Sequence, residues 1–234
     1  MKKIFKRLSK CRSCGSKNFI KIYKNEPSPV GESFLKKKNS KLLTNKKYPL
    51  NLLMCKKCKL AQLDNIVNPE IVYKEYIYIT ESNTGLVNHF KKASSRLISK
   101  LRLKKRSSVL DIGSNDGSLL NFFKKKGNKV LGIEPAKQAY KLSKSKGINT
   151  INDFFSDRLV KKIILKYGQF DLIIANNVFA NIDDINSWLK NIKKTLKTKG
   201  SFVFESSYLL DLLRNKVFDF IYHEHLNSFT IKSQ

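Results

Sequence analysis

Apolar and polar residues alternate in a regular way along the last two thirds of the chain. Short apolar runs, which predict buried strands, are separated by stretches whose apolar residues recur at helical spacing. Because strands that alternate with helices form a parallel sheet, the pattern predicts an α/β fold. The predicted strands are 109–112, 129–133, 147–151, 170–175 and 201–205, and the predicted helices are 85–103, 118–123, 136–146 and 184–196.

The turn after the first of these strands predicts a cofactor site. Asp111 lies near the end of the strand, and the turn itself contains Gly113, Asn115 and Gly117, whose two glycines let the backbone approach a ligand closely. Glu134 follows about 20 residues later, at the tip of the next strand, where α/β nucleotide sites place the acceptor for ribose hydroxyls. The G-x-G-x-x-G pattern of dinucleotide sites is absent, so S-adenosylmethionine is the better fit. The alternative is a turn that only packs.

Two further polar positions follow later strands. Asp153, just past the third strand, is placed to accept a hydrogen bond from an adenine amine. Asn176, past the fourth strand, stands at the carboxyl edge of the sheet, where ligands bind. Each residue is equally well interpreted as a cap or turn residue.

The four cysteines form two C-x-x-C pairs in the first quarter of the chain. They are Cys11, Cys14, Cys55 and Cys58. Two such pairs can complete the tetrahedral shell of one zinc ion, which leaves no position for a substrate and makes the ion structural. Disulfides are the alternative, but the chain shows no secretory signal. We therefore predict a zinc-binding domain over residues 1–68, followed by a connecting helical segment over 69–105.

The composition is strongly basic, but the type of basic residue argues against nucleic acid. The chain has 234 residues, 41% of them hydrophobic, and a formal net charge of +29, yet only 7 of its 47 basic residues are arginine. Phosphate and base recognition favours arginine, so we expect a nucleotide-bearing substrate rather than a nucleic acid. No segment is long and apolar enough to cross a bilayer, and we expect a cytoplasmic protein without a membrane partner.

The last part of the chain holds Tyr222, His223, Glu224 and His225 in succession, with two of the three histidines. Histidine is the side chain most easily tuned to exchange a proton near neutral pH. The H-E-x-x-H spacing of zinc proteases is absent, so this cluster indicates proton transfer rather than a second metal site.

Several motifs occur together in an order that resembles the S-adenosylmethionine-dependent sugar C-methyltransferases, which act on nucleotide-linked deoxy keto sugars. They are the cysteine pairs, Tyr48-Pro49-Leu50, Tyr76-x-Tyr78, the S-N-D-G turn, Ala175-Asn176-Asn177-Val178 and Tyr222-x-Glu224-His225. The resemblance implies a class I methyltransferase Rossmann-like sheet at 106–234, with S-adenosylmethionine and zinc as cofactors. It also implies that His225, beside Tyr222 and Glu224, removes the proton next to the sugar ketone, so that an enolate attacks the methyl group.

Two departures from the family pattern lead to further expectations. Asn181 stands where the family has a histidine, and the chain ends at Gln234, before the sixth and seventh strands and a C-terminal domain. We expect the sheet to lack these strands and a separate chain to be one source of the missing part. The alternatives are a zinc-ribbon RNA methyltransferase, and an inactive truncated remnant that binds cofactor or a partner chain.

Overall fold

The computed structural model of the chain describes residues 4–31, 47–74, 76–217 and 219–233. The contacts divide the chain into two units. Unit 1 consists of Met1–Tyr73, Phe179–Asn186 and Ser206–Gln234, and unit 2 of Lys74–Val178 and Ser187–Glu205. This division differs from the predicted boundaries at 1–68, 69–105 and 106–234, because residues 179–186 and 206–234 pack with the N-terminal part of the chain.

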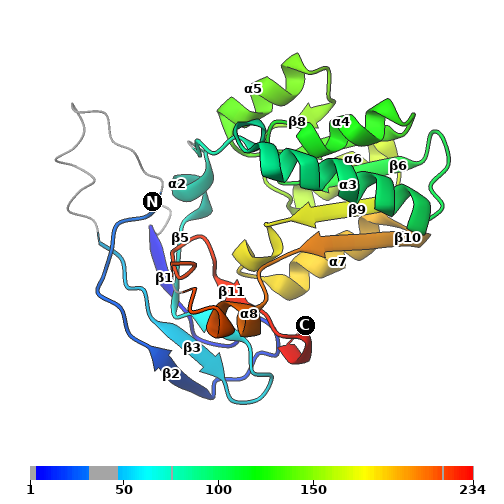
Figure 1. Cartoon of the computed structure of the whole chain (residues 1–234). Helices are drawn as coiled ribbons and strands as arrows, with labels where there is room; N and C mark the ends of the chain where they lie inside the picture. Colours follow the sequence, from blue (N-terminus) through cyan, green and yellow to red (C-terminus); the bar gives the residue numbers. More distant parts are fainter. Residues whose placement is uncertain (1–3, 32–46, 75, 218, 234) are drawn as a thin grey trace. The chain divides into compact units, whose positions relative to one another are not determined.

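Unit 2 is built on a five-stranded parallel sheet, which confirms the predicted fold class. The strands lie in the order β10-β9-β6-β7-β8. Their bounds are β6 (Ser108–Ile112), β7 (Lys129–Ile133), β8 (Thr150–Ile151), β9 (Phe170–Asn176) and β10 (Leu196–Glu205). The chain proceeds from β6 outward through β7 to β8, then returns to the other side of β6 with β9 (Figure 1). Such a reversal opens a crevice at the carboxyl ends of the central strands.

The third strand is shorter than predicted. Residues 147–149 are not part of β8, which pairs with β7 only through Thr150 opposite Gly132 and Ile151 opposite Ile133. Gly147 has a φ of +69°, a turn conformation that ends the preceding helix.

Helices flank this sheet at all four predicted places, and the structure adds one more. The bounds are α3 (Thr84–Lys100), α4 (Ser118–Lys125), α5 (Lys137–Ser145), α6 (Asp157–Tyr167) and α7 (Ile185–Thr195). Helix α6 was not predicted, although Leu159, Val160 and Ile163 form a buried face at helical spacing. The Ser156 side chain caps it by accepting a hydrogen bond from the Leu159 N–H, a second signal in the sequence.

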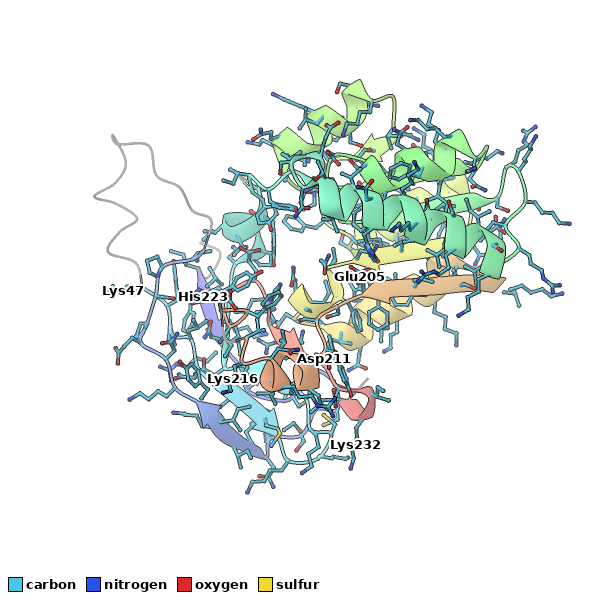
Figure 2. All side chains as sticks on the ribbon, viewed as in Figure 1. Lys47, Glu205, Asp211, Lys216, His223 and Lys232 are labelled. Atoms are coloured by element: carbon cyan, nitrogen blue, oxygen red, sulfur yellow. The ribbon has the colours of Figure 1, made fainter. Side chains whose placement is uncertain are left out.

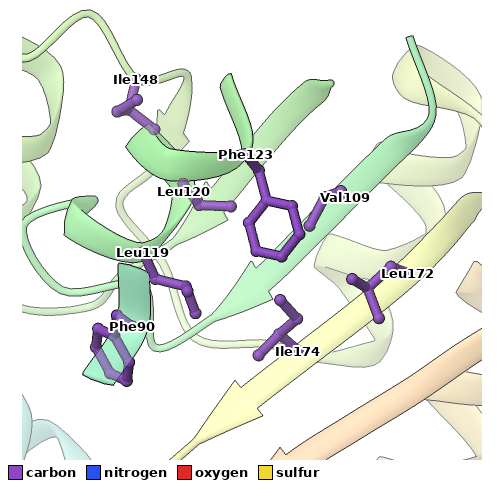
Figure 3. Close-up of a cluster of buried hydrophobic side chains, with 8 residues drawn as sticks. All are labelled: Phe90, Val109, Leu119, Leu120, Phe123, Ile148, Leu172 and Ile174. Atoms are coloured by element: carbon purple, nitrogen blue, oxygen red, sulfur yellow. The ribbon is translucent and has the colours of Figure 1, made fainter. Parts of the chain in front are cut away.

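The main core of unit 2 lies between α3, α4 and the centre of the sheet. Eight buried side chains form it, and Figure 3 shows the Phe123 ring beside Val109 and Ile174. The central strands are therefore buried, and polar residues at their carboxyl ends are held on a rigid frame.

Unit 1 combines two antiparallel sheets formed by distant parts of the chain. The first has the order β11-β4-β3-β2, and the second pairs β1 with β5. The bounds are β1 (Phe5–Arg7), β2 (Phe19–Tyr23), β3 (Leu52–Cys55), β4 (Ala61–Leu63), β5 (Asn65–Val67) and β11 (Asn227–Ser228), with helices α2 (Pro69–Tyr73) and α8 (Leu209–Arg214). Strand β11 pairs with β4, and Leu209 and Leu226 share a buried cluster with Leu63. These contacts explain why the C-terminal residues belong to unit 1.

A buried arginine joins the three segments of unit 1. The Arg12 guanidinium donates to the Asp183 carboxylate at 2.8 Å and to the carbonyls of Leu63 at 2.7 Å, Asn65 at 2.9 Å and Leu226 at 3.5 Å. Burial lowers the pKa of Arg12, and the Asp183 carboxylate opposes that shift. Hydrogen bonds and an ion pair thus compensate the desolvation of this charge.

In the described ranges, no helix has the length and apolar character needed to cross a membrane.

Candidate functional site

The two cysteine pairs of unit 1 adopt the same backbone turn. In the first, the Gly15 N–H donates to the Cys11 carbonyl at 3.0 Å, and in the second, the Lys59 N–H donates to the Cys55 carbonyl at 2.9 Å. Gly15 and Lys59 both have positive φ, +73° and +63°. The repeated turn brings each pair of thiols together on one side of its loop.

All four thiols meet at one point, as a shared metal ion requires. Their sulfur atoms lie within 4.8 Å of one another, with 3.6 Å between Cys11 and Cys58 and 3.5 Å between Cys14 and Cys55. Tetrahedral zinc with bonds of about 2.3 Å places its sulfur ligands about 3.8 Å apart. The cluster therefore fits one zinc ion.

Burial and hydrogen bonds shift the pKa values of two of these thiols in opposite directions. Burial alone would raise the pKa of Cys55, but the N–H groups of Cys58 and Lys57 lower it to about 7. Burial and the three neighbouring thiols raise the pKa of Cys58 to about 12. Outside the four ligands, the buried Gln62 amide donates to the Cys11 sulfur at 3.2 Å, a contact that the sequence did not indicate. Such outer contacts orient metal ligands.

The predicted cofactor turn of unit 2 follows β6 directly. Gly113 has a φ of +73° and Gly117 a φ of +76°. A Cβ at Gly113 would collide with the Val178 side chain, and one at Gly117 would lie 2.7 Å from the Ser143 hydroxyl. Both positions therefore require glycine for conformation and for space.

Glu134 lies at the end of β7, beside this turn. Its carboxylate accepts hydrogen bonds from the N–H of Asn115 at 2.8 Å and of Ala136 at 2.7 Å. Burial raises the pKa of Glu134, and these two N–H groups limit the rise. A carboxylate can accept about four hydrogen bonds, so two remain for a ligand hydroxyl.

Asp111, at the end of β6, is a buried carboxylate without compensation. Asp111 is 3% exposed, and no donor among the described residues is hydrogen-bonded to its side chain. Burial raises its pKa well above the ordinary value, and the nearby Glu134 adds to the shift. Two close buried carboxylates favour a ligand that brings positive charge and hydroxyl donors. S-adenosylmethionine, with a sulfonium, an ammonium and a ribose, has both.

The other predicted cofactor residues lie at the same edge of the sheet, and two of them, Asn115 and Asp153, have protein partners for their side chains. Both polar atoms of the Asn115 side chain are bound by the segment before α3. Asp153 follows β8 and accepts from its neighbour Phe154 N–H at 2.8 Å and from Arg158 at 3.0 Å. Asn176 ends β9 opposite Glu205. Figure 2 labels Glu205, the last residue of β10.

The sequence analysis did not identify two residues of this turn region, Asp116 and Lys146, which form a partly buried ion pair at 2.9 Å. Asp116 lies inside the recognised turn and could have been singled out. Lys146 carried no signal, because it is one of 40 lysines.

The predicted proton-transfer residues belong to unit 1 and not to the unit that contains the turn. The Tyr222 hydroxyl lies 3.0 Å from Nε2 of His225, and Nδ1 of His225 lies 3.2 Å from the Phe220 carbonyl. Since a carbonyl only accepts, Nδ1 carries the proton and Nε2 is the basic atom. Burial lowers the pKa of His225 and so favours its neutral form, while the Phe220 carbonyl opposes that shift. Glu224 is buried beside it.

His223, the other histidine of the cluster, is buried in a different environment. Its Nε2 lies 3.3 Å from the Tyr48 carbonyl and 3.2 Å from the Pro49 carbonyl, and its ring packs edge-on against Tyr48. His223 therefore contacts the Tyr48-Pro49 segment through both its ring nitrogen and its ring edge.

Two family models match the chain. One, described as "Methyltransferase domain", covers residues 87–233, and the other, described as "Putative zinc binding domain", covers residues 11–73. The second range includes all four clustered cysteines, so residues 11–73 form a zinc-binding domain.

The chain is also similar to individual proteins. It is 27% identical to the C-methyltransferase NovU of Streptomyces niveus over 233 residues, which are 100% of this chain and 55% of NovU. It is 26% identical to an uncharacterized methyltransferase of Alkaliphilus oremlandii over 155 residues, 62% of this chain and 69% of that protein. A SAM-dependent methyltransferase structure from Archaeoglobus fulgidus matches with a TM-score of 0.50 at 19% identity, covering 62% of this chain and 64% of that one. This last likeness shows the class I fold. The chain thus spans about half the length of NovU.

Proposed function

The chain belongs to the methyltransferase domain family, and we propose that it transfers a methyl group to a carbon atom of a nucleotide-linked deoxy keto sugar. S-adenosylmethionine is the cofactor, and when bound it supplies an electrophilic methyl group. The zinc ion of unit 1 is structural, because four thiolates fill its coordination shell.

The observation that carries the cofactor assignment is the pair of buried carboxylates, Asp111 and Glu134. The Asp111 carboxylate lacks a protein donor among the described residues, so a cationic group of the cofactor offsets its desolvation. Glu134 is fixed by two backbone N–H groups and keeps acceptor capacity for the ribose hydroxyls. The turn around Gly113 and Gly117 lets the backbone approach the same ligand.

The assignment of a carbon acceptor rests on His225 and on the likeness to NovU. A carbon nucleophile requires removal of a proton, and Nε2 of His225 is an unprotonated imidazole nitrogen held in place by Phe220 and Tyr222. His225 would accept the proton next to the sugar ketone. The electron pair left on carbon would then form the bond to the methyl group as the sulfur–methyl bond breaks, with the electron pair of that bond remaining on sulfur. Tyr222 and Glu224 orient His225 and the substrate.

The test of the base is proton exchange in heavy water. A nucleotide-linked deoxy keto sugar should exchange the proton next to its ketone with solvent deuterium, and His225→Ala should abolish this exchange while leaving cofactor affinity unchanged. Tyr222→Phe should slow it about tenfold or more. Tyr167→Phe, on α6, is the control and should exchange at the normal rate. Normal exchange in His225→Ala would remove the proposed base.

The test of the cofactor site is calorimetric titration of the protein with S-adenosylmethionine. Glu134→Ala should weaken binding by about 1 to 3 kcal/mol, because ribose hydroxyls are left unpaired. Unchanged affinity would contradict this placement. The titration measures cofactor binding alone and does not require activity on a sugar. This separation is useful because the chain spans only 55% of NovU.

A further inference from the structure

A short segment of unit 2, residues 78–82, is tied to the cofactor turn by several contacts. We call it the strap; it contains the 3-10 helix η2 (Thr80–Ser82) and ends where α3 begins. Asn115 accepts from the Thr80 N–H at 2.9 Å and donates from its amide to the Tyr78 carbonyl at 2.9 Å. Asp116 accepts from the Glu81 N–H at 3.1 Å. Two consecutive side chains of the turn therefore hold the backbone of the strap.

The Lys146 side chain also joins the strap to the turn, through two ion pairs. The Lys146 ammonium, just past the end of α5, lies 2.9 Å from the Asp116 carboxylate and 3.0 Å from the Glu81 carboxylate. The Asp116 side chain is fully buried, whereas the Glu81 side chain is 66% exposed. Lys146 thus compensates a buried charge of the turn and reaches outward to the strap at the same time.

The strap is connected to the cofactor carboxylate through one residue. Asn115 binds the strap with its side chain and donates its own N–H to Glu134 at 2.8 Å. Its φ of +48° is a left-handed conformation, which asparagine tolerates better than most residues. A displacement of the strap therefore acts on the backbone of Asn115 and, through it, on the orientation of Glu134.

We propose that Lys146 is a positioning residue for the cofactor, which holds the strap on the turn by joining Asp116 to Glu81 and so fixes Glu134 for the ribose. The inference rests on the proposed cofactor site. By thermodynamic linkage, a bound cofactor must in turn hold the strap more firmly. An ion pair with a merely local role would leave cofactor affinity unchanged.

The experiment compares four variants of the whole chain by calorimetric titration with S-adenosylmethionine. Lys146→Met should weaken binding about tenfold or more. Glu81→Gln, which removes only the Lys146–Glu81 ion pair, should weaken it about threefold. Lys146→Arg keeps a cation and should stay within about twofold of the unchanged protein. Asp157→Asn, which removes an exposed carboxylate paired at 4.0 Å on α6, is the control and should bind normally.

Cleavage by chymotrypsin gives a second measurement, made first without and then with the cofactor. Without cofactor, cleavage after Tyr76 and Tyr78 should be faster in Glu81→Gln than in Asp157→Asn. In the unchanged protein, S-adenosylmethionine should protect these bonds. Normal affinity in folded Lys146→Met and Glu81→Gln would overturn the proposal, and so would unchanged cleavage in Glu81→Gln. If the unchanged protein binds no cofactor but Glu81→Gln is still cleaved faster, the strap contacts hold and the cofactor assignment fails.

Discussion

The two units each bury a charge, but they treat it in opposite ways. Arg12 in unit 1 is 6% exposed and Asp111 in unit 2 is 3% exposed. Arg12 donates to a carboxylate and to carbonyl oxygens, whereas Asp111 has no donor among the described residues and lies near a second carboxylate. A buried charge that has its full set of partners needs no ligand to offset its desolvation, and one without partners favours a ligand that supplies them.

The metal dependence of unit 1 should give the largest effect. Removal of zinc by a chelator, or Cys55→Ser, should unfold unit 1, since binding of structural zinc contributes on the order of 10 kcal/mol. Unit 2 has its own core and should keep its helical circular dichroism. Hydrogen exchange resolved by peptide would measure both units at once. Equal loss of protection in unit 2 would show that the two units do not differ in this respect.

Replacement of Arg12 tests the charge that has partners. Arg12→Met should lower the free energy of unfolding by about 3 to 5 kcal/mol, because it leaves buried carbonyls without a donor and leaves Asp183 with only the Lys6 ion pair at 3.6 Å. Arg7→Met, at the exposed end of β1, is the matched control and should change stability little. Urea denaturation of the zinc-loaded protein provides the measurement. Equal midpoints for the two variants would mean that Arg12 contributes no more than a surface charge.

Replacement of Asp111 should raise the free energy of unfolding, whereas replacement of Arg12 should lower it. Asp111→Asn should stabilise the cofactor-free protein by about 1 kcal/mol and abolish cofactor binding, because it removes a buried charge without a partner. Asp171 on the adjacent β9 is the contrast: burial raises its pKa, but Ser108 and Lys197 donate to it and the net shift is downward. Asp171→Asn should therefore destabilise. Thermal unfolding of both variants without cofactor decides this, and a loss of stability in Asp111→Asn would contradict our account.

The contributions of Asp111 and Asp171 to the free energy of unfolding should depend on pH in opposite directions. The pKa of Asp111 is raised in the folded protein, so stability without cofactor should fall as the pH rises above the ordinary pKa of aspartate toward the raised value. The pKa of Asp171 is lowered, so its contribution is present above the ordinary value and is lost as the pH falls through the folded value. Denaturation curves of the single variants across this acid range would separate the two contributions.

The smallest effect separates the two cysteine turns. Gly15 and Lys59 occupy equivalent positions with positive φ, but only Gly15 is free of the steric cost. Lys59→Gly should raise the free energy of unfolding by about 0.5 to 1 kcal/mol, and Gly15→Ala should lower it by a similar amount. Denaturation at fixed zinc concentration is the measurement. Destabilisation by Lys59→Gly would indicate that the lysine side chain itself supports the turn.

The sequence predicted those parts of the molecule whose signals are local. The strands around Asp111 and the cysteine pairs depend on neighbouring residues, so their apolar runs and spacing were sufficient. The position of Tyr222 and His225 in unit 1 could not be predicted, because it depends on pairing of β11 with β4, far apart in the chain. Lys146 was equally hidden, since its role depends on where the end of α5 comes to lie. The cofactor and base roles of the predicted residues stay predictions until the experiments above are done.

The contacts of Arg12 also bear on how the protein is made. Its partners Asp183 and Leu226 lie 171 and 214 residues further along the chain. At translation rates of about 5 to 20 residues per second, they leave the ribosome roughly 10 to 40 s after Arg12. All four cysteines emerge early in this interval, so zinc can bind while the arginine beside Cys11 still lacks two of its partners. The order of synthesis therefore allows the metal site to form before Arg12 has its full set of partners and before unit 2 is complete.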